Sequence, residues 1–416
     1  MEKLRINGGK KLEGKLSVQG AKNSVLPILA ASILINGESH LENCPNLKDV
    51  NAAISILAHL GCKVTRKDKE IHIDSSGLNT HEIPDHLMRE MRSSVIFLGA
   101  ILGRTGHAVL SMPGGCELGP RPIDLHLNAL RDLGAEIEEI GGNIVCRAPK
   151  LVGAKINLSS PSVGATENAM LAAICAEGQT IITNAAKEPE IVDLQNFLVA
   201  AGANIHGAGQ STIFVEGGTL HKQVKHKVIP DRIVTATYLS AVAFTGGRLE
   251  MEDIVPEHVQ TVILALKAAG CEIETRGNIL NVRSKGRLEA ITPVITRPYP
   301  GFPTDAQPCL LAACTRAKGT TVFIENIFQN RYRYVDELKR MGANIKLEGR
   351  VAVVSGVKEL VGAHVAATDL RGGAALVVAA LGAKGETTVS EICHIDRGYD
   401  GLESVLSSLG ADIIRT

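Results

Sequence analysis

Hydrophobic and polar positions follow two alternating patterns along this chain. Runs in which nearly every residue is apolar, such as LAASILI and LAAICA, are followed by a glycine and then by residues that alternate between apolar and polar. The first pattern predicts a buried helix and the second a β-strand. The pattern occurs six times at a spacing of about 70 residues, which indicates an internal repeat. Its glycines are Gly37, Gly106, Gly178, Gly247, Gly319 and Gly385.

A second glycine motif has the same period. It reads apolar-x-x-Leu-Gly-Ala/Cys, as in ILAHLGC and ALRDLGA, with Leu sometimes replaced by Ala or Met. Its glycines are Gly61, Gly134, Gly202, Gly270, Gly342 and Gly410. Both glycines of each copy are expected at helix C-termini, where glycine adopts positive φ most easily. Each copy therefore predicts a βαβαββ unit and an α/β or α+β fold, and six units could form two domains of three.

Composition excludes several classes of protein. The 416 residues carry 44 basic and 44 acidic side chains, no tryptophan and 3% aromatic residues, which disfavours a nucleic-acid-binding protein. The N-terminus has no apolar segment typical of a signal peptide, and no apolar run is long enough for a membrane span. The nine cysteines lack CxxC spacing, so we expect neither a disulfide framework nor a zinc site. These features favour a cytoplasmic protein.

Cations stand at the predicted helix starts, where acidic residues or Ser and Thr are usual. They are Lys22, Arg92, Arg232 and Arg371 at first helices, and Arg121, Arg331 and Arg397 at second helices. Each alone could be a solvated charge at a loop end. Because a helix N-terminus is positive, however, repeated cations there predict an opposing anion. We therefore expect a ligand with several negative charges, bound between the domains.

Two further residues depart from the repeat. Cys116 lies in the Pro/Gly-rich segment MPGGCELGPRP, with Arg121 five residues further on. A nearby cation could lower its thiol pKa, making it a candidate nucleophile or proton donor, although an incidental surface thiol has the same pattern. Asp305, in FPTDAQP, is acidic where other repeats carry cations, and is either a simple N-cap or a general base. Cys62, Cys175, Cys271 and Cys314 match apolar repeat positions and are expected in the core.

Several segments together resemble the UDP-N-acetylglucosamine enolpyruvyl transferases of the EPSP synthase superfamily. They are GAKNSVLPILAASIL, PGGCELGPRPIDLH, AAKEPEIVDL, GFPTDAQP, NRYRYVDELKRMGA, ATDLRGG and HIDRGYDG. The resemblance implies a two-domain inside-out α/β barrel with three βαβαββ repeats per domain. Residues 22–229 would form one domain, and residues 1–21 with 230–416 the other, with the active site in the cleft between them.

The resemblance also implies a reaction. Enolpyruvyl would pass from phosphoenolpyruvate to the 3′-hydroxyl of UDP-N-acetylglucosamine with release of phosphate, through a tetrahedral intermediate, in the first committed step of peptidoglycan synthesis. No cofactor or metal is implied, and the partners expected are these two small substrates, with no nucleic acid or membrane. Cys116 would be the proton donor to the enol methylene and would also form a covalent phospholactoyl adduct. Asp305 would take the 3′-hydroxyl proton.

The resemblance assigns the remaining site residues by position. Lys22 and Asn23 would contact phosphoenolpyruvate, while Arg121 and Arg397 would hold its phosphate or carboxylate. Arg331 and Arg371 would complete the cationic cluster. The sugar-nucleotide site would comprise Arg92, Arg121, Pro122, Ile123, Asp124, Leu125, Ser162, Val163, Gly164, Asp305 and Ile327. Ser160 departs from the family, in which many members have lysine, so one uridine or diphosphate contact is in doubt.

Two alternatives have distinguishing features. A shikimate-pathway enolpyruvyl transferase would share the fold and donor, but its glycine/Ser-Lys-Ser signature near the N-terminus is replaced here by GAKN, and it has no cysteine at this loop. A non-catalytic paralogue that only binds a sugar nucleotide would be expected to lose Cys116, Asp305 or members of the arginine set. None of these residues is lost.

Overall fold

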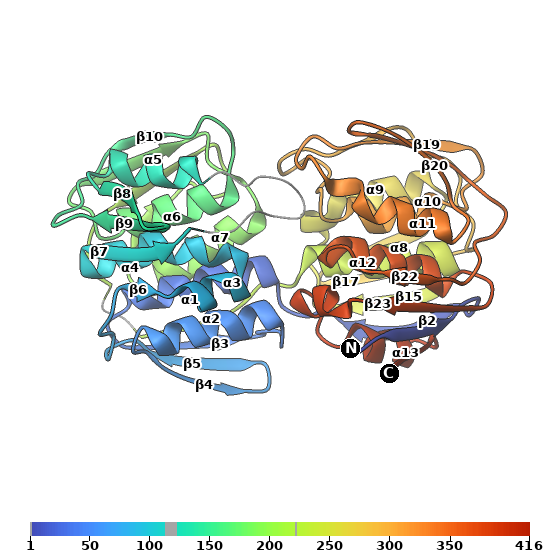
Figure 1. The fold of residues 1–416 in the computed structure, drawn as a ribbon, viewed down its shortest axis with the longest axis horizontal. Helices are drawn as coiled ribbons and strands as arrows, with labels where there is room; N and C mark the ends of the chain where they lie inside the picture. Colours follow the sequence, from blue (N-terminus) through green and yellow to red (C-terminus); the bar gives the residue numbers. More distant parts are fainter. Residues whose placement is uncertain (1, 113–122, 221–222) are drawn as a thin grey trace. The chain divides into compact units, whose positions relative to one another are not determined.

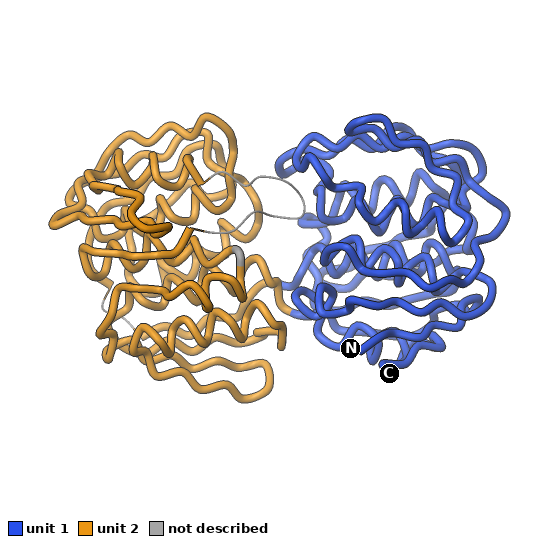
Figure 2. Tube along the Cα trace, in the orientation of Figure 1, with its two compact units in different colours: residues 1–19, 117–119, 230–416 blue, residues 20–116, 120–229 orange. Residues whose placement is uncertain are grey.

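The chain divides into two compact units in a computed structural model that describes residues 2–112, 123–220 and 223–416. Unit 1 comprises the residues up to Gln19 together with Pro230–Thr416, and unit 2 comprises Gly20–Ile229 outside the undescribed segments (Figure 2). Each unit contains three four-stranded sheets within the described residues. The mixed α/β class and the six repeats expected from the sequence are thus confirmed. Among the described residues, no helix combines the length and apolar character needed to span a bilayer.

Unit 2 is built from three sheets and the helices between their strands (Figure 1). Its strands, in spatial order, are β14 (Val224–Lys227), β3 (Glu38–Glu42), β5 (Glu70–Asp74) and β4 (Lys63–Lys67); β6 (Glu82–Ile83), β7 (His107–Ser111), β9 (Asn143–Arg147) and β8 (Glu136–Ile140); and β10 (Lys155–Asn157), β11 (Gln179–Thr183), β13 (Thr212–Glu216) and β12 (Asn204–His206). Its helices are α1 (Lys22–Ala31), η1 (Ser32–Leu34), α2 (Lys48–His59), α3 (Asp85–Glu90), η2 (Arg92–Ile96), α4 (Phe97–Thr105), α5 (Asp124–Asp132), α6 (Val163–Ala173) and α7 (Pro189–Ala200).

Unit 1 repeats this plan. Its strands, in spatial order, are β16 (Glu272–Arg276), β17 (Ile279–Ser284), β15 (Gly247–Glu252) and β2 (Leu12–Ser17); β18 (Val294–Ile295), β19 (Thr320–Ile324), β21 (Val351–Ser355) and β20 (Asn344–Glu348); and β22 (His364–Ala366), β23 (Glu386–Ser390), β1 (Leu4–Asn7) and β24 (Asp412–Arg415). Its helices are α8 (Arg232–Thr245), η3 (Pro256–Val259), α9 (Gln260–Ala268), α10 (Gln307–Cys314), η4 (Arg331–Tyr334), α11 (Val335–Arg340), α12 (Leu370–Leu381), η5 (Ile392–Arg397) and α13 (Leu402–Ser408).

Each sheet joins one parallel pair to an antiparallel hairpin. In the repeat that runs from β10 to β13, β10 and β11 are parallel and are connected through α6. After α7, the chain forms the β12–β13 hairpin, and β13 inserts antiparallel beside β11. This arrangement is the βαβαββ unit expected from the alternating pattern.

Three repeats are completed by strands from distant parts of the chain, and one of these strands is β2, which pairs in parallel with β15 as the first strand of the fourth repeat. β14, at the end of unit 2, pairs in parallel with β3 and supplies the first strand of the first repeat. β1, at the N-terminus, lies between β23 and β24 and pairs antiparallel with both. Each unit therefore closes on itself, and in unit 1 the two ends of the chain lie side by side in one sheet (Figure 1).

The first helices of the repeats form the core of each unit. In unit 1, α8, α10 and α12 pack against one another, and eleven of the twelve residues of α12 are buried. In unit 2, α4 packs against both α1 and α6. Helices that are apolar all round are stable only where every face is covered, which explains the Ala/Leu-rich runs of the sequence. Three of the predicted cations, Lys22, Arg232 and Arg371, stand in the first turns of the inner helices α1, α8 and α12.

The second-motif glycines end their helices as expected. After α2, Gly61 N–H donates to Ala58 C=O at 3.1 Å and Cys62 N–H donates to Leu57 C=O at 3.0 Å. This pair of bonds is the Schellman motif, which requires positive φ at the glycine. All six glycines of the motif have φ between +92° and +105°, and the same two bonds follow each helix.

The expectation that the first-motif glycines cap helices is wrong for most copies. Only Gly106 caps its helix directly, at the end of α4 with φ of +72°. α6, for example, ends at Ala173, whereas Gly178 stands immediately before β11 with φ of +84°. A turn of backbone separates the end of the helix from the strand. The glycine is needed where the chain bends into the strand, because that bend has positive φ.

Candidate active site

A buried cluster of arginines surrounds Asp305 in unit 1. Arg331 Nη2 donates to Asp305 Oδ1 at 2.7 Å, and Arg371 Nε donates to Oδ2 at 3.4 Å. The arginine side chains are only 1% and 2% exposed, whereas the Asp305 side chain is 29% exposed. The structure thus brings together three residues that the sequence analysis singled out. The carboxylate is the solvent-facing member of the cluster.

Local contacts hold Arg331 in place. Its Nε and Nη2 both donate to Thr304 C=O, at 3.1 and 2.7 Å, and its Nη1 lies 3.9 Å from Asp369 Oδ1. Its guanidinium also lies over the ring of Phe328, 5.5 Å from the centroid. Because a buried guanidinium is costly to desolvate, these partners are what make its position stable.

Arg371 is held by the start of its own helix. Asp369 is the N-cap of α12 and accepts from the backbone N–H of Arg371 and Gly372. A Cβ at Gly372 would lie 2.6 Å from an Asp369 oxygen, so the sequence needs glycine here. The Arg371 guanidinium lies over Tyr399, 5.3 Å from its ring centroid, and burial raises the pKa of that tyrosine. Asp369 and Tyr399 were missed in the sequence, where an aspartate before LRGG gives only a capping signal.

Glu325 positions two predicted site residues at once. This fully buried carboxylate accepts from Thr304 Oγ1 at 2.9 Å through Oε2 and from Ile327 N–H at 2.8 Å through Oε1. Thr304 precedes Asp305, and the Ile327 side chain is 38% exposed. The carboxylate therefore ties the segment of the general-base candidate to that of a sugar-site candidate. Nothing in the sequence pattern marks Glu325.

Lys22 in unit 2 also has an acidic partner. It is the first residue of α1, and its Nζ lies 2.5 Å from Asp49 Oδ2 in the first turn of α2. Both side chains are buried, while the neighbouring Asn23 is half-buried. Together with Asp305 and Asp369, Asp49 shows that carboxylates of the chain itself balance part of the cationic charge that the sequence analysis attributed to a ligand.

The start of α6 is shaped by His126. Ser162 is the N-cap, accepting from Ala165 N–H at 3.3 Å, and Val163 begins the helix. A Cβ at Gly164 would lie 2.7 Å from His126 Cε1, which explains the glycine. His126 Nδ1 is 2.8 Å from Asn168 Nδ2, and burial lowers the pKa of His126 to about 4. The imidazole is therefore neutral near pH 7 and accepts this bond.

The remaining sequence candidates are spread over both units. Cys116, Arg121 and Pro122 lie outside the described residues. Arg92 begins η2 and Arg397 ends η5. Ile123 and Leu125 are half-buried around the start of α5, whose first residue is the exposed Asp124, and Ser160 is exposed.

Most of the described cysteines are buried or half-buried and are poor nucleophiles. Cys62, Cys271 and Cys314 are buried and Cys175 is half-buried, which confirms the expectation of core positions. Burial raises the pKa of the Cys62 thiol to about 11 and that of Cys314 to about 12. Among the described cysteines, Cys393 alone is exposed. The described thiols with raised pKa values are therefore protonated near neutral pH.

A cavity of about 290 Å³ lies beside the Asp305 segment in unit 1. Arg232, the first residue of α8, lines it with its guanidinium over Tyr299, 5.6 Å from the ring centroid. Pro303, two residues before Asp305, lines the same cavity. Unit 1 therefore combines a cavity, a cationic side chain and a partly exposed carboxylate, which suits a polar, anionic ligand.

Comparison with known proteins defines the class. The family model for EPSP synthase (3-phosphoshikimate 1-carboxyvinyltransferase) matches residues 6–406. The structure is similar to an enolpyruvyl transferase, NikO, from Streptomyces tendae, with a TM-score of 0.89 and 25% identity over 100% of this chain and 99% of that one. It is also similar in fold to an EPSP synthase from Acinetobacter baumannii, with a TM-score of 0.77 and 20% identity over 100% of both chains. These matches define an enzyme of the enolpyruvyl (carboxyvinyl) transferase class.

Full-length relatives identify the branch of that class. The chain is 52% identical to UDP-N-acetylglucosamine 1-carboxyvinyltransferase 2 of Caldanaerobacter subterraneus over 100% of both chains. It is 49% identical to UDP-N-acetylglucosamine 1-carboxyvinyltransferase 1 of Symbiobacterium thermophilum over 100% of this chain and 95% of the relative. The chain belongs to the UDP-N-acetylglucosamine 1-carboxyvinyltransferase family, as its sequence segments suggested.

Proposed function

We propose that Asp305 and Cys116 act as the base and the acid of the enolpyruvyl transfer that this family performs. The enzyme transfers the enolpyruvyl group of phosphoenolpyruvate to the 3′-hydroxyl of UDP-N-acetylglucosamine and releases phosphate, in peptidoglycan synthesis. The full-length identity of 52% to a relative named for this activity carries the assignment.

The reaction needs a base and an acid. Asp305 accepts the 3′-hydroxyl proton while the hydroxyl oxygen forms a bond to C2 of phosphoenolpyruvate, and Cys116 donates a proton to C3. The resulting tetrahedral intermediate then loses phosphate from C2 and a proton from C3, which restores the double bond. The position of Asp305 supports its role, because Arg331 and Arg371 bind its two oxygens while the side chain remains partly exposed.

The remaining cations bind the anionic groups of the substrates. Phosphoenolpyruvate carries about −2.5 to −3 charges near neutral pH, because it has a carboxylate and a phosphate whose second pKa is near 6. We assign this charge to Lys22, Arg121 and Arg397, with Asn23 as a further contact. Arg92, the segment 121–125, the segment 162–164 and Ile327 take the sugar nucleotide. We place the enzyme in the cytoplasm, because its nine cysteines do not have the spacing of a disulfide framework.

A phosphate-release assay tests the proposal. Phosphate should appear from phosphoenolpyruvate only when UDP-N-acetylglucosamine is added, and not with shikimate 3-phosphate as the acceptor. Asp305→Asn should abolish turnover, because an amide cannot take the hydroxyl proton. Asp336→Asn is the matched control, since Asp336 is an exposed carboxylate whose partner is Lys339 on the same helix. Release with shikimate 3-phosphate, or full activity of Asp305→Asn, would contradict the proposal.

A further inference from the structure

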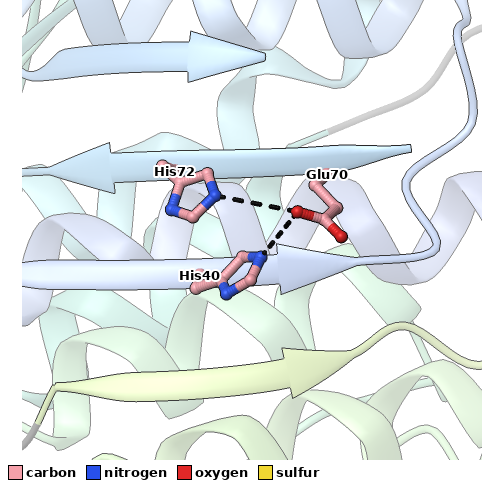
Figure 3. Close-up of side chains that lie close together, drawn as sticks. All are labelled: His40, Glu70 and His72. Carbon is pink, nitrogen blue, oxygen red and sulfur yellow. Dashed lines mark hydrogen bonds and ion pairs between the residues drawn. The ribbon is translucent and has the colours of Figure 1, made fainter. Parts of the chain in front are cut away.

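Three potential metal ligands meet on the outer face of a sheet in unit 2. His40 on β3 lies directly opposite His72 on β5 in the antiparallel register. Glu70 precedes His72 by two residues on β5, so both side chains lie on the same face of the sheet. Figure 3 shows both imidazoles directed at one carboxylate oxygen of Glu70. None of these residues has a role in the proposed transfer reaction.

The three donor groups are close enough to share one ion. His40 Nε2 lies 3.3 Å from Glu70 Oε2, and His72 Nε2 lies 3.9 Å from the same oxygen. One ligand atom from each of the three residues lies within 4.8 Å of the others. In a tetrahedral site with bonds of about 2.0–2.2 Å, neighbouring ligand atoms are roughly 3.4 Å apart. The first distance already fits, and the second requires a small movement of exposed side chains.

We propose that His40, Glu70 and His72 bind a divalent transition-metal ion of the zinc type. Two imidazoles and one carboxylate suit Zn²⁺, Ni²⁺ or Cu²⁺, whereas Mg²⁺ and Ca²⁺ prefer sites made of oxygen ligands. The side chains are 26%, 46% and 52% exposed for His40, Glu70 and His72, so water can complete the coordination. The His rings are stacked at 4.0 Å between centroids, and the bound ion would make them splay apart.

The charges around this site permit a cation. Lys225 on β14 is the cross-strand neighbour of His40, and it is the nearest lysine in the register on that side. Its ammonium is 2.7 Å from Glu42 Oε1, which balances its charge. On the other side, β4 places the uncharged Thr65 opposite His72 and Lys67 opposite Glu70. The ion would therefore meet one carboxylate and two imidazoles, and Lys67, which is exposed, is the positively charged neighbour of the carboxylate ligand.

Binding would cross-link β3 to β5. Both strands belong to the sheet that β14 completes, so the ion would stabilise the pairing of β3 and β5 within that sheet. An ion that binds the folded chain and not the unfolded chain raises the midpoint of thermal unfolding in proportion to the logarithm of its concentration.

Isothermal titration of the chelator-treated full chain with ZnCl₂ tests the proposal. The parent should bind one more Zn²⁺ per chain than His40→Ala/His72→Ala, with micromolar Kd, and Glu70→Gln should weaken that site roughly tenfold or more. His206→Ala is the matched control, because this exposed histidine of unit 2 stacks on Phe214 instead. Subtracting the double variant removes any contribution of cysteine thiols, and MgCl₂ should give no saturable heat.

Cobalt provides a spectroscopic check of the ligands. Co²⁺ in the parent should give a tetrahedral visible spectrum that is absent in the double variant and lacks a thiolate charge-transfer band. Equal Zn²⁺ stoichiometry and Kd in the parent and the double variant would overturn the proposal, as would a parent that binds no Zn²⁺. The metal site is tested by Zn²⁺ binding and the transfer reaction by phosphate release. Failure of one proposal can therefore be distinguished from failure of the other.

Discussion

At the residue scale, the candidate site depends on acidic partners that the sequence does not mark. The motif around Asp305 and the arginines at helix starts were recognisable because they break the repeat. Asp49, Asp369 and Glu325 were not, since each occurs in an ordinary context and the side chain with which it pairs is distant in sequence. Asp49 pairs with Lys22 across two helices, and Glu325 reaches back to Thr304. Such pairs form only when the fold brings distant residues together, so no local pattern in the sequence indicates them.

The role of Cys116 can be tested by substitution at that position. If Cys116 acts as an acid and is not an essential nucleophile, Cys116→Asp should keep substantial turnover while Cys116→Ser loses most of it, because a serine hydroxyl is far too weakly acidic. Phosphate release measures both variants. An inactive aspartate variant would contradict the acid role. Cys393→Ser is the control, because this thiol is exposed and has no role in the proposed reaction.

Labelling gives a second test of the same residue. An electrophilic phosphonate epoxide should modify Cys116, and more rapidly when UDP-N-acetylglucosamine is present, if binding of the nucleotide completes the site around the thiol. Peptide mass mapping locates the adduct. Modification at other cysteines, or a rate independent of the nucleotide, would argue against this prediction.

Glu167 on α6 should make stability depend on pH. Burial, with a contribution from Glu190 and Glu188, raises the pKa of Glu167 from 4.5 to about 8. Between these values the folded chain holds a proton that the unfolded chain releases. The free energy of unfolding should therefore fall as pH rises across that range, by at most about 1.4 kcal/mol per pH unit.

Urea unfolding at several pH values checks this. Glu167→Gln keeps the neutral shape and should remove that part of the decline, so the variant gains stability relative to the parent from pH 6 to pH 8. Glu216→Gln, at an exposed position on β13, is the control. A parallel decline in parent and Glu167→Gln would show that the buried carboxyl is not responsible.

At the element scale, helix ends were predictable wherever one residue has a geometric requirement. The six Schellman glycines share a narrow range of φ, and their spacing in the sequence revealed the repeat. The first-motif glycines were misassigned, because Gly178 and its counterparts serve the entrance of a strand rather than the end of a helix. Sequence shows that a glycine recurs, and only the backbone path shows which bend it serves.

Gly342 isolates the cost of the left-handed conformation. It follows α11 with φ of +92°, and nothing lies within 4 Å of a Cβ placed there. Gly342→Ala should thus destabilise unit 1 by about 1 kcal/mol through backbone strain alone, without a steric clash. Thermal unfolding of this variant can be compared with Lys339→Ala in the preceding turn, which should change little. Equal stability of Gly342→Ala and the parent would contradict the αL assignment.

At the scale of the whole molecule, the closure of each unit was beyond sequence analysis. The period revealed six copies in a row, but not that β14 completes the first repeat and β1 the last. A periodic pattern is read along the chain, whereas closure joins segments from its ends. The assignment of residues 1–21 to the domain of 230–416 came from family resemblance alone.

The borrowed strand β1 should control the stability of unit 1. Leu4 and Ile6 are buried, and their double replacement by alanine should remove several kcal/mol by creating cavities. Hydrogen exchange should then accelerate in β23 and β24, the two strands that β1 joins, while β11 and β13 of unit 2 stay protected. Faster exchange confined to the N-terminal residues would show that β1 contributes little to its sheet.

The position of β1 also sets an order of events during synthesis. Its partners, β23 and β24, leave the ribosome about 380 and about 410 residues later, roughly 20–80 s at ordinary elongation rates. The described residues of unit 2 all lie between Gly20 and Ile229 in the sequence, so this unit can be completed within that interval. Until the last repeat emerges, β1 has no partner strand. Aggregation of β1 would be opposed by the charged residues in and beside it, which are Arg5, Lys10 and Lys11. Strand β1, which is translated long before both of its partners, is thus among the last to pair.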